Sequence, residues 1–217
     1  MRTATHLAVA VAALCVAVAA GAAEKSSPKQ GAQEDAAARA RLEEVLRASF
    51  KAHGQAGLDR LEQDELQAAC SRTPSDGPLP TAAGKRLVAA QLKTLVYPAE
   101  GVLLGDWKQG EAIAQNGAGK QYSDDPAKPS GGNCYACHQL SKQEVSFGTL
   151  GPSLWHYGKL RGSSPGMQKY TYAKIYNPQA FTACSTMPRF GHHAILTEQQ
   201  IKDLVALLLD PASPVNQ

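Results

Sequence analysis

Five consecutive residues carry the clearest chemistry in the sequence: Cys134-Tyr135-Ala136-Cys137-His138. This is the C-x-x-C-H pattern, in which two thiols form thioethers with the two vinyl groups on one edge of a porphyrin. The imidazole that follows then lies under the iron as its proximal ligand. The pattern therefore predicts one covalently bound haem c, attached through Cys134 and Cys137 and ligated by His138.

Paired cysteines also occur in redox disulfides and in zinc sites. A redox pair usually opens a helix within a strand–helix–strand pattern, and no such pattern surrounds these residues. A zinc site needs a second pair of ligands at a matching spacing. The remaining histidine pair, His192 and His193, is adjacent and fits that spacing poorly. Both alternatives therefore explain the motif less well than haem does.

The iron of such a haem has a sixth position, and Met187 is the best candidate to fill it. It lies 187 − 138 = 49 residues after His138, which leaves enough chain to pass around the haem edge and return on the other face. A thioether is a soft ligand, and His/Met ligation raises the reduction potential, which suits electron transfer. Four other residues remain rival ligands: Met167, His156, His192 and His193.

The segment between the motif and Met187 supplies further candidates. If the fold is that of a cytochrome c, the Pro152 carbonyl accepts the other N–H of the proximal imidazole and orients it. The alternative is that Gly151-Pro152 is an ordinary turn. Some of the aromatic residues are expected to cover the porphyrin, and Arg161 is a candidate partner for a propionate. The aromatic residues are Trp155, Tyr157, Tyr170, Tyr172, Tyr176 and Phe181.

The haem domain is expected to span residues 102–217 and to be helical. Asp106 is a candidate N-cap for a helix that begins at Trp107. Thr197 and Gln200 form a capping-box pattern before a second helix, whose apolar positions recur at helical spacing. These positions are Ile201, Leu204, Val205 and Leu208, and Pro211 stops the helix. The fold class is therefore all-α, with a haem domain like that of class I cytochromes c.

The residues before the haem domain divide into three parts. Residues 1–23 indicate a secretory signal peptide, because Arg2 precedes an apolar run and small residues that suit cleavage. The alternative is that this segment is retained as a membrane anchor. No lipoprotein site is expected, because Cys15 follows Leu14 rather than a small residue. Residues 24–34 are predicted to be a flexible tether. Residues 35–101 are predicted to be a helical extension, in which one helix runs from about Leu58 to Cys70. The extension is either packed on the haem domain or used to dock a partner.

Two cysteines of the exported chain lie outside the haem motif, Cys70 and Cys184. Unpaired thiols are uncommon in oxidising compartments, so a disulfide between them is expected. A bridge to a partner chain and two free thiols remain open alternatives. A disulfide would connect the extension to the stretch that carries Met187.

Composition narrows the class of protein only slightly. The chain has 22 Lys and Arg against 19 Asp and Glu, a formal net charge of +3. This small excess does not suggest nucleic-acid binding. No second apolar run is long enough to cross a bilayer after removal of the signal peptide.

Several stretches resemble the SoxX family of monohaem cytochromes. CSTMPRFGH at residues 184–192 is similar to its axial-methionine loop, and LTEQQIKDLVALLLDPASPVN at residues 196–216 is similar to its C-terminus. GNC at residues 132–134 and GTLGPSL at residues 148–154 match as well. The resemblance covers about residues 102–216, and the methionine loop together with the tail narrows it beyond c-type cytochromes in general.

The resemblance implies a periplasmic heterodimer with a SoxA-type haem subunit. This complex is an L-cysteine S-thiosulfotransferase, which oxidatively joins thiosulfate to a cysteine of the carrier protein SoxY. The resemblance implies that the present chain accepts the electrons and passes them to a small cytochrome c, and that it does not catalyse alone. A free-standing electron-carrier cytochrome is the second hypothesis. A haem sensor or peroxidase with a labile methionine ligand is the third.

Overall fold

The computed structural model describes residues 28–72, 79 and 81–217. Within these residues the structure is helical, and the only β-structure is an isolated bridge between His53 and Ala56. The expected signal peptide, residues 1–23, lies outside the described residues. The chain divides into two compact units, Met1–Leu46 and Arg47–Gln217. Among the described helices, none has the length and apolar character needed to cross a membrane.

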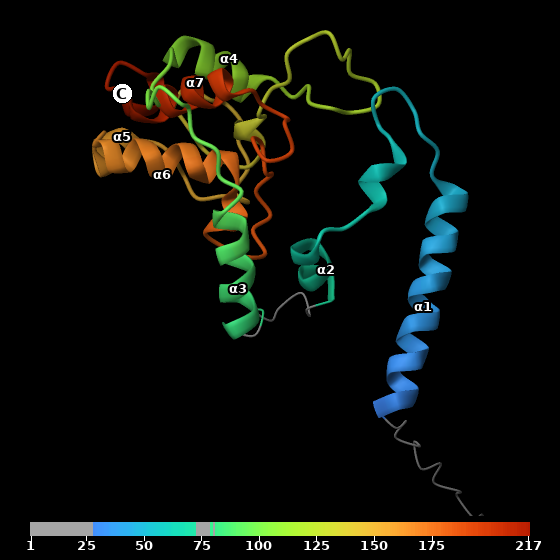
Figure 1. The fold of residues 1–217 in the computed structure, drawn as a ribbon. Coiled ribbons are helices and arrows are strands. Elements are labelled where there is room, and N and C mark those ends of the chain that lie inside the picture. Colours follow the sequence, from blue (N-terminus) through green and yellow to red (C-terminus); the bar gives the residue numbers. More distant parts are fainter. Residues whose placement is uncertain (1–27, 73–78, 80) are drawn as a thin grey trace, which may run out of the picture. The chain divides into compact units, whose positions relative to one another are not determined.

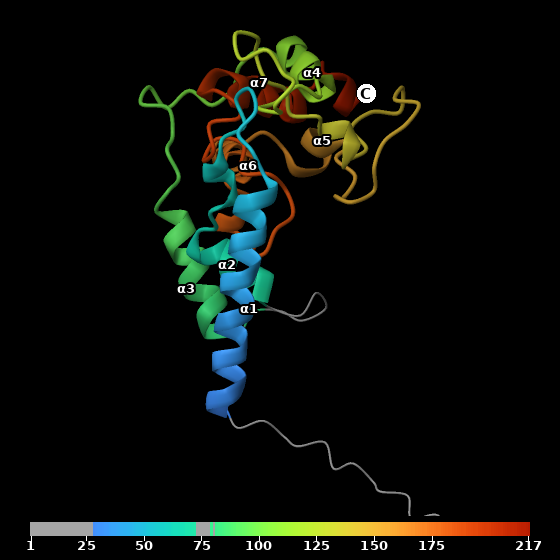
Figure 2. The same cartoon turned by 90° about the vertical axis from the view of Figure 1, so that its right-hand side faces the viewer.

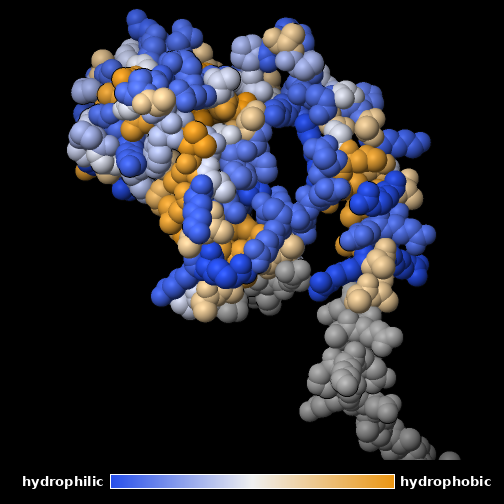
Figure 3. Space-filling model, viewed as in Figure 1, coloured by the Kyte–Doolittle hydropathy of each residue, from blue (hydrophilic) through white to orange (hydrophobic). Residues whose placement is uncertain are grey.

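Helix α1 (Pro28–Ser49) starts within the stretch that was expected to be a tether, residues 24–34. Residues 28–34 are helical in the structure, and Lys, Gln, Ala and Glu in this stretch are good helix formers. Leu42 and Val45 are each more than half exposed. Figure 3 shows apolar side chains on the surface of the C-terminal part of α1.

The rest of the extension forms a 3₁₀ helix, η1 (Leu58–Leu61), and two α-helices, α2 (Glu65–Arg72) and α3 (Thr81–Leu92). A single helix from Leu58 to Cys70 was expected, and the structure breaks it before α2. The break occurs because Asp64 and Gln67 form a reciprocal cap: each backbone N–H donates to the other's side chain, at 2.9 and 2.8 Å. This pairing begins a new helix at Glu65.

Two helices far apart in the sequence form the centre of the haem domain, α4 (Trp107–Gln115) and α7 (Glu198–Leu209). They lie side by side in both views (Figures 1 and 2). Gly110 allows this close crossing, because a Cβ there would meet the α7 backbone and come within 2.9 Å of the Leu207 Cβ. The expected caps are confirmed: Asp106 accepts a hydrogen bond from Lys108 N, and Thr197 and Gln200 form the capping box of α7.

Two helices between the motif and α7 were not predicted, α5 (Tyr157–Arg161) and α6 (Pro165–Tyr176). Ser164 begins α6 by accepting a hydrogen bond from Met167 N, with Pro165 at the first helical position. The core of this domain includes four residues that are completely buried: Ile201, Val205, Leu207 and Val215. Burying side chains of this size stabilises the fold by about 1.5–3 kcal/mol each.

The C-terminal tail joins α5 to α7 through the side chain of Asn216, which is 0% exposed. Its Nδ2 donates to Leu208 O at 3.1 Å and Asp210 O at 2.8 Å, which lie at the C-terminal end of α7. Its Oδ1 accepts from the backbone N–H groups of Gly158 and Lys159, at 2.8 and 3.1 Å. One amide therefore satisfies helix-end groups that have no partner within their own helices.

Candidate haem site

The C-x-x-C-H motif begins in a short 3₁₀ helix, η2 (Cys134–Ala136). Asn133 precedes it in the left-handed region, with φ 44°, and the backbone N–H groups of Cys137 and His138 both donate to Cys134 O. This tight turn lets Cys134, Cys137 and His138 line a single cavity. Tyr135, between the two cysteines, is buried in the core.

The proximal imidazole is fixed by its neighbours on the segment 148–154. His138 Nδ1 lies 2.7 Å from Pro152 O, as expected from the sequence. Gly151 packs so closely on the ring that a Cβ at this position would overlap the imidazole. Because the carbonyl can only accept, Nδ1 carries the proton and Nε2 is left as a lone-pair donor. The geometry therefore presents Nε2 as the ligating atom.

Met187 lines the same cavity, which has a volume of about 520 Å³. Met167, His156, His192 and His193 are absent from its lining, so the cavity separates Met187 from the rival ligands. Met167 instead lies 3.7 Å from Tyr157 Oη, and His156 Nε2 lies 2.7 Å from Gln217 O.

The residues around this cavity fit a haem. Most of the lining is apolar and includes Leu140, Leu154, Phe190, Leu204 and Leu208. The volume is in the usual range for cofactor sites. Both motif thiols are free of disulfides. Burial raises the pKa of the Cys134 thiol to about 12. The donor set is a soft thioether and an imidazole, which suits iron in a porphyrin.

The zinc alternative finds no support in the part of the chain that the structure describes. Among those residues, no group of three or more His, Cys, Asp or Glu side chains is placed to hold a metal ion.

Comparison with known proteins agrees with this site. The family model for cytochrome c matches residues 108–210. A protein of Aquifex aeolicus (strain VF5), named an uncharacterized lipoprotein, is 40% identical over 158 residues, or 71% of this chain and 73% of the relative. Residues 108–210 of the chain are therefore a cytochrome c domain. The cytochrome therefore carries covalently bound haem c and is an electron carrier.

One solved structure also resembles the cytochrome. The crystal structure of SoxXA from P. pantotrophus matches with a TM-score of 0.37 and 23% identity, over 55% of this chain and 95% of that chain. Similarity at this level carries no argument about function.

The aromatic residues expected to cover the haem divide into two groups. Tyr157 and Tyr170 line the cavity of the cytochrome. The other four, Trp155, Tyr172, Tyr176 and Phe181, are not among the lining residues. Tyr172 is instead 1% exposed and stacks between Tyr97 and Tyr176. Two of the six aromatic residues thus line the cavity, and Tyr172 is instead part of the core.

Two cationic side chains line the cavity of the cytochrome, Arg161 and Lys174. Arg161 was a candidate partner for a propionate, whereas Lys174 was missed. Burial lowers the pKa of Lys174. Helical spacing could have indicated Lys174 from the sequence, because it places Lys174 on one face of a helix with three neighbours. These neighbours are Tyr170, Thr171 and Ile175, and all four residues line the cavity.

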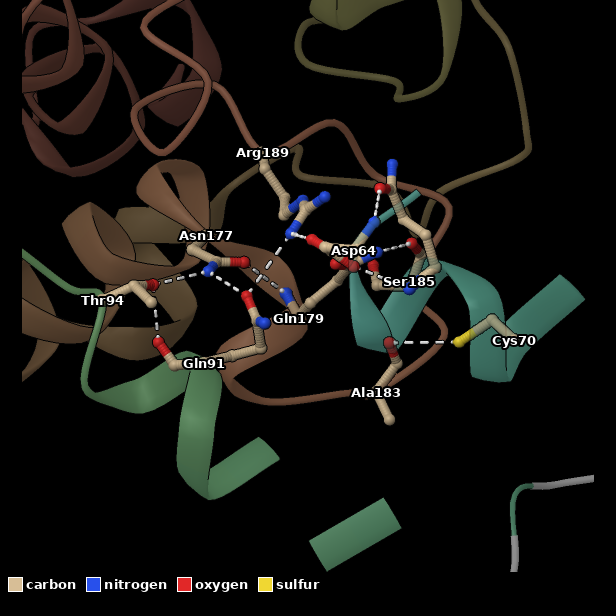
Figure 4. A network of polar contacts seen from close by, with 10 residues as sticks. Asp64, Cys70, Gln91, Thr94, Asn177, Gln179, Ala183, Ser185 and Arg189 are labelled. Carbon is tan, nitrogen blue, oxygen red and sulfur yellow. Dashed lines mark hydrogen bonds and ion pairs between the residues drawn. The ribbon is translucent and has the colours of Figure 1, made fainter. Parts of the chain in front are cut away.

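The extension of the cytochrome contacts the segment that carries Met187. Cys70 and Cys184 form a disulfide, with their Cα atoms 5.6 Å apart. Arg189 Nη1 lies 2.6 Å from Asp64 Oδ2 (Figure 4). Burial acts to raise the pKa of Asp64. Hydrogen bonds from Gln67 and Arg189 and the charge of Arg189 outweigh this effect, so the pKa of the carboxyl lies below its ordinary value.

Proposed function

We propose that Cys134 and Cys137 attach the haem and that His138 and Met187 are its axial ligands. The observation that carries this assignment is the single cavity that all four side chains line. The hydrogen bond between His138 Nδ1 and Pro152 O supports it, because this bond leaves Nε2 directed to the metal.

These ligands favour electron transfer over catalysis at the iron. The haem supplies one-electron chemistry when bound. His138 and Met187 would hold the iron from its two faces, which would leave no position for a substrate. The apolar lining, which includes Leu140 and Leu204, keeps water away from the site. A dry site and a thioether ligand both favour a raised reduction potential.

We also propose that the cytochrome is the SoxX-type subunit of a thiosulfate-oxidising complex. Two sequence features support this proposal: the methionine loop CSTMPRFGH at residues 184–192 and the tail DPASPVN at residues 210–216. The SoxA-type partner, the SoxY carrier protein and the acceptor cytochrome c follow from this resemblance.

The proposed reaction joins thiosulfate to a cysteine thiol of the carrier protein. A sulfur–sulfur bond forms, the thiol loses its proton, and two electrons leave. The partner subunit carries out the sulfur chemistry, and this chain receives the electrons singly. A small cytochrome c is the oxidant that removes them. Within the described residues of this chain, the cavity offers no side chain arranged as a nucleophile toward sulfur.

Thiosulfate-dependent reduction of this haem tests the proposal. The holoprotein is mixed with thiosulfate and the carrier protein, with or without the SoxA-type subunit, and the absorbance of the reduced haem is followed. Reduction that requires the partner supports the proposed subunit. Absence of reduction, when every other component is active, would refute it and leave a free-standing electron carrier as the function. Binding of carbon monoxide to the reduced wild-type protein would instead favour a sensor or peroxidase.

We propose that the cytochrome is exported to the periplasm. Haem c is attached outside the cytoplasm, and the leader at residues 1–23 has the composition of a signal peptide. The relative from Aquifex aeolicus is named a lipoprotein. Cys15 and its neighbour Leu14 lie outside the described residues. Phase partitioning of the full-length protein in a detergent tests whether this chain is anchored, since a lipidated form enters the detergent phase.

A further inference from the structure

The extension holds the Met187 segment on both sides of the methionine. The disulfide between Cys70 and Cys184 lies three residues before Met187. The ion pair between Asp64 and Arg189 lies two residues after it. Asp64 caps α2 and Cys70 lies in the second turn of this helix, so one short helix supplies both attachments.

Arg189 depends on Asp64 for its charge balance. The Arg189 side chain is only 3% exposed, and its second amino nitrogen has no hydrogen-bond partner among the described residues. Asp64 is itself fixed, because its other carboxylate oxygen accepts from Gln67 N at 2.8 Å. Removing the carboxylate would leave a buried guanidinium without a compensating charge, which is strongly unfavourable.

Helix α3 adds a third attachment, just before the methionine loop. Asn177 is 0% exposed, and its Nδ2 donates to Gln91 Oε1 at 2.8 Å and to Thr94 Oγ1 at 3.0 Å. Arg189 Nη1 lies 3.5 Å from the same Gln91 oxygen. Figure 4 shows these side chains converging on the segment from two elements of the extension.

The haem domain itself holds the methionine loop by backbone hydrogen bonds after the methionine, where Gly191 N and His192 N both donate to Tyr176 O at 3.1 Å. No α-helix includes residues 181–197, and the hydrogen bonds closest to the methionine are long. Met187 N donates to Ser185 Oγ at 3.3 Å, and Gln179 Nε2 donates to Ser185 O at 3.4 Å. The shortest ion pair and the covalent bond at this loop both come from the extension.

We propose that Asp64 and Cys70 are positioning residues that hold Met187 in place as the sixth ligand. Residues 64–72 and 81–94 thereby act as a clamp that keeps this coordination position closed to outside ligands. The proposal rests on the proposed function, because it requires that Met187 ligates the iron. It assigns the extension a role beyond that of a partner-docking surface.

Binding of added imidazole to the oxidised holoprotein tests the clamp. Imidazole binds only when Met187 has left the iron, so its apparent affinity is proportional to the fraction of open protein. Asp64→Asn keeps the size of the side chain and the cap of α2 but removes the charge. Its apparent affinity is expected to rise at least about tenfold, as the open fraction grows.

The matched control is Glu65→Gln at the adjacent residue. Glu65 pairs with Arg86 at 2.5 Å, and both side chains are more than 60% exposed. This variant removes the same charge from the same turn of α2 but contacts nothing in the methionine loop. Its imidazole affinity is expected to stay within about twofold of wild type, since exposed pairs contribute little.

A double-mutant cycle shows whether the effect passes through the methionine. In a Met187→Ala background the position is already open, so Asp64→Asn is expected to add nothing. An equal rise in both backgrounds would mean general loosening of the pocket and would overturn the proposal. The variant Cys70→Ser/Cys184→Ser provides a second test that does not depend on the ion pair, with the same expected rise.

The absorption band of methionine-ligated ferric haem separates the two possible failures. If wild-type protein lacks the band, the axial assignment of Met187 fails, and the clamp fails with it. If the band is present but both clamp variants bind imidazole like Glu65→Gln, the clamp alone is refuted. Circular dichroism of each variant establishes that it is folded before the titration.

Discussion

Replacing Asn216 with Ala is expected to destabilise the haem domain by about 3 kcal/mol. The side chain is fully buried and bonds to groups at the ends of two helices. Alanine removes these bonds without introducing any group that could replace them. Asn216 itself does not line the cavity, although Leu208, whose carbonyl it bonds, does, so the change is read out as stability of the fold.

The magnitude follows from the groups that lose their partner. The Leu208 carbonyl is buried, and a buried group without a partner costs about 1–3 kcal/mol. The Asp210 carbonyl and the N–H groups of Gly158 and Lys159 are only partly buried, so water recovers part of their loss. A total of about 3 kcal/mol is a large share of the ~5–15 kcal/mol that stabilises a typical domain.

Urea denaturation followed by circular dichroism measures this loss. With a slope of about 2 kcal/mol per molar, the midpoint is expected to fall by roughly 1.5 M. The control is Gln217→Ala, because the Gln217 side chain bonds only to Pro211 O in an exposed position. It is expected to change the free energy of unfolding by less than about 0.5 kcal/mol.

The variant Asn216→Asp separates the contribution of the amide oxygen, which accepts from α5, from that of the amide nitrogen, which donates to the end of α7. It keeps the acceptor for the N–H groups of α5 but places a negative charge beside the carbonyl groups that end α7, where the helix dipole is also negative. It is expected to be at least as destabilising as Asn216→Ala. The reasoning would be refuted if Asn216→Ala resembled Gln217→Ala, or if Asn216→Asp retained wild-type stability.

Two further predictions concern packing and pH. Gly110→Ala is expected to cost about 1–3 kcal/mol in urea denaturation, because its Cβ would overlap the α7 backbone, whereas Gly166→Ala in α6 meets nothing within 4 Å and is expected to be neutral or slightly stabilising. Burial, followed by the charge of Arg189, lowers the pKa of His192 and His193 below 6.5 in the folded protein. Their contribution to stability is therefore complete above about pH 6.5 and is lost as the pH falls, because the unfolded chain then binds more protons. Urea midpoints at several pH values should show this slope, and replacing both histidines with asparagine should flatten it.

Short-range signals made much of the haem domain predictable. The caps at Asp106 and Thr197 depend on residues within one helical turn, so they are visible in the sequence and are present in the structure. The hydrogen bond from His138 to Pro152 was predicted from the expected fold and is also present. The Asp64-x-x-Gln67 cap carried the same kind of local signal and was overlooked, which is why one long helix was predicted in place of two short ones.

Two features could not be derived from local pattern. Helix α6 buries Thr171, Tyr172, Ala173 and Ile175, which surround much of the helix, so it has no clear amphipathic period. The pairing of Arg189 with Asp64 joins residues 125 apart, and neither residue has a neighbour that indicates the other. Such contacts are fixed by tertiary packing, which the sequence pattern alone does not specify.

The disulfide has a consequence for the biogenesis of the protein. The loop that Cys70 and Cys184 close has a sequence separation of 114 residues and contains both motif thiols, Cys134 and Cys137. Of the six single disulfides that four cysteines can form, only Cys70–Cys184 leaves both motif thiols available. The cell must therefore oxidise one pair while it keeps the other reduced in the same compartment. Once thioethers have formed, the motif sulfurs no longer take part in thiol exchange, and haem attachment itself removes the incorrect pairings.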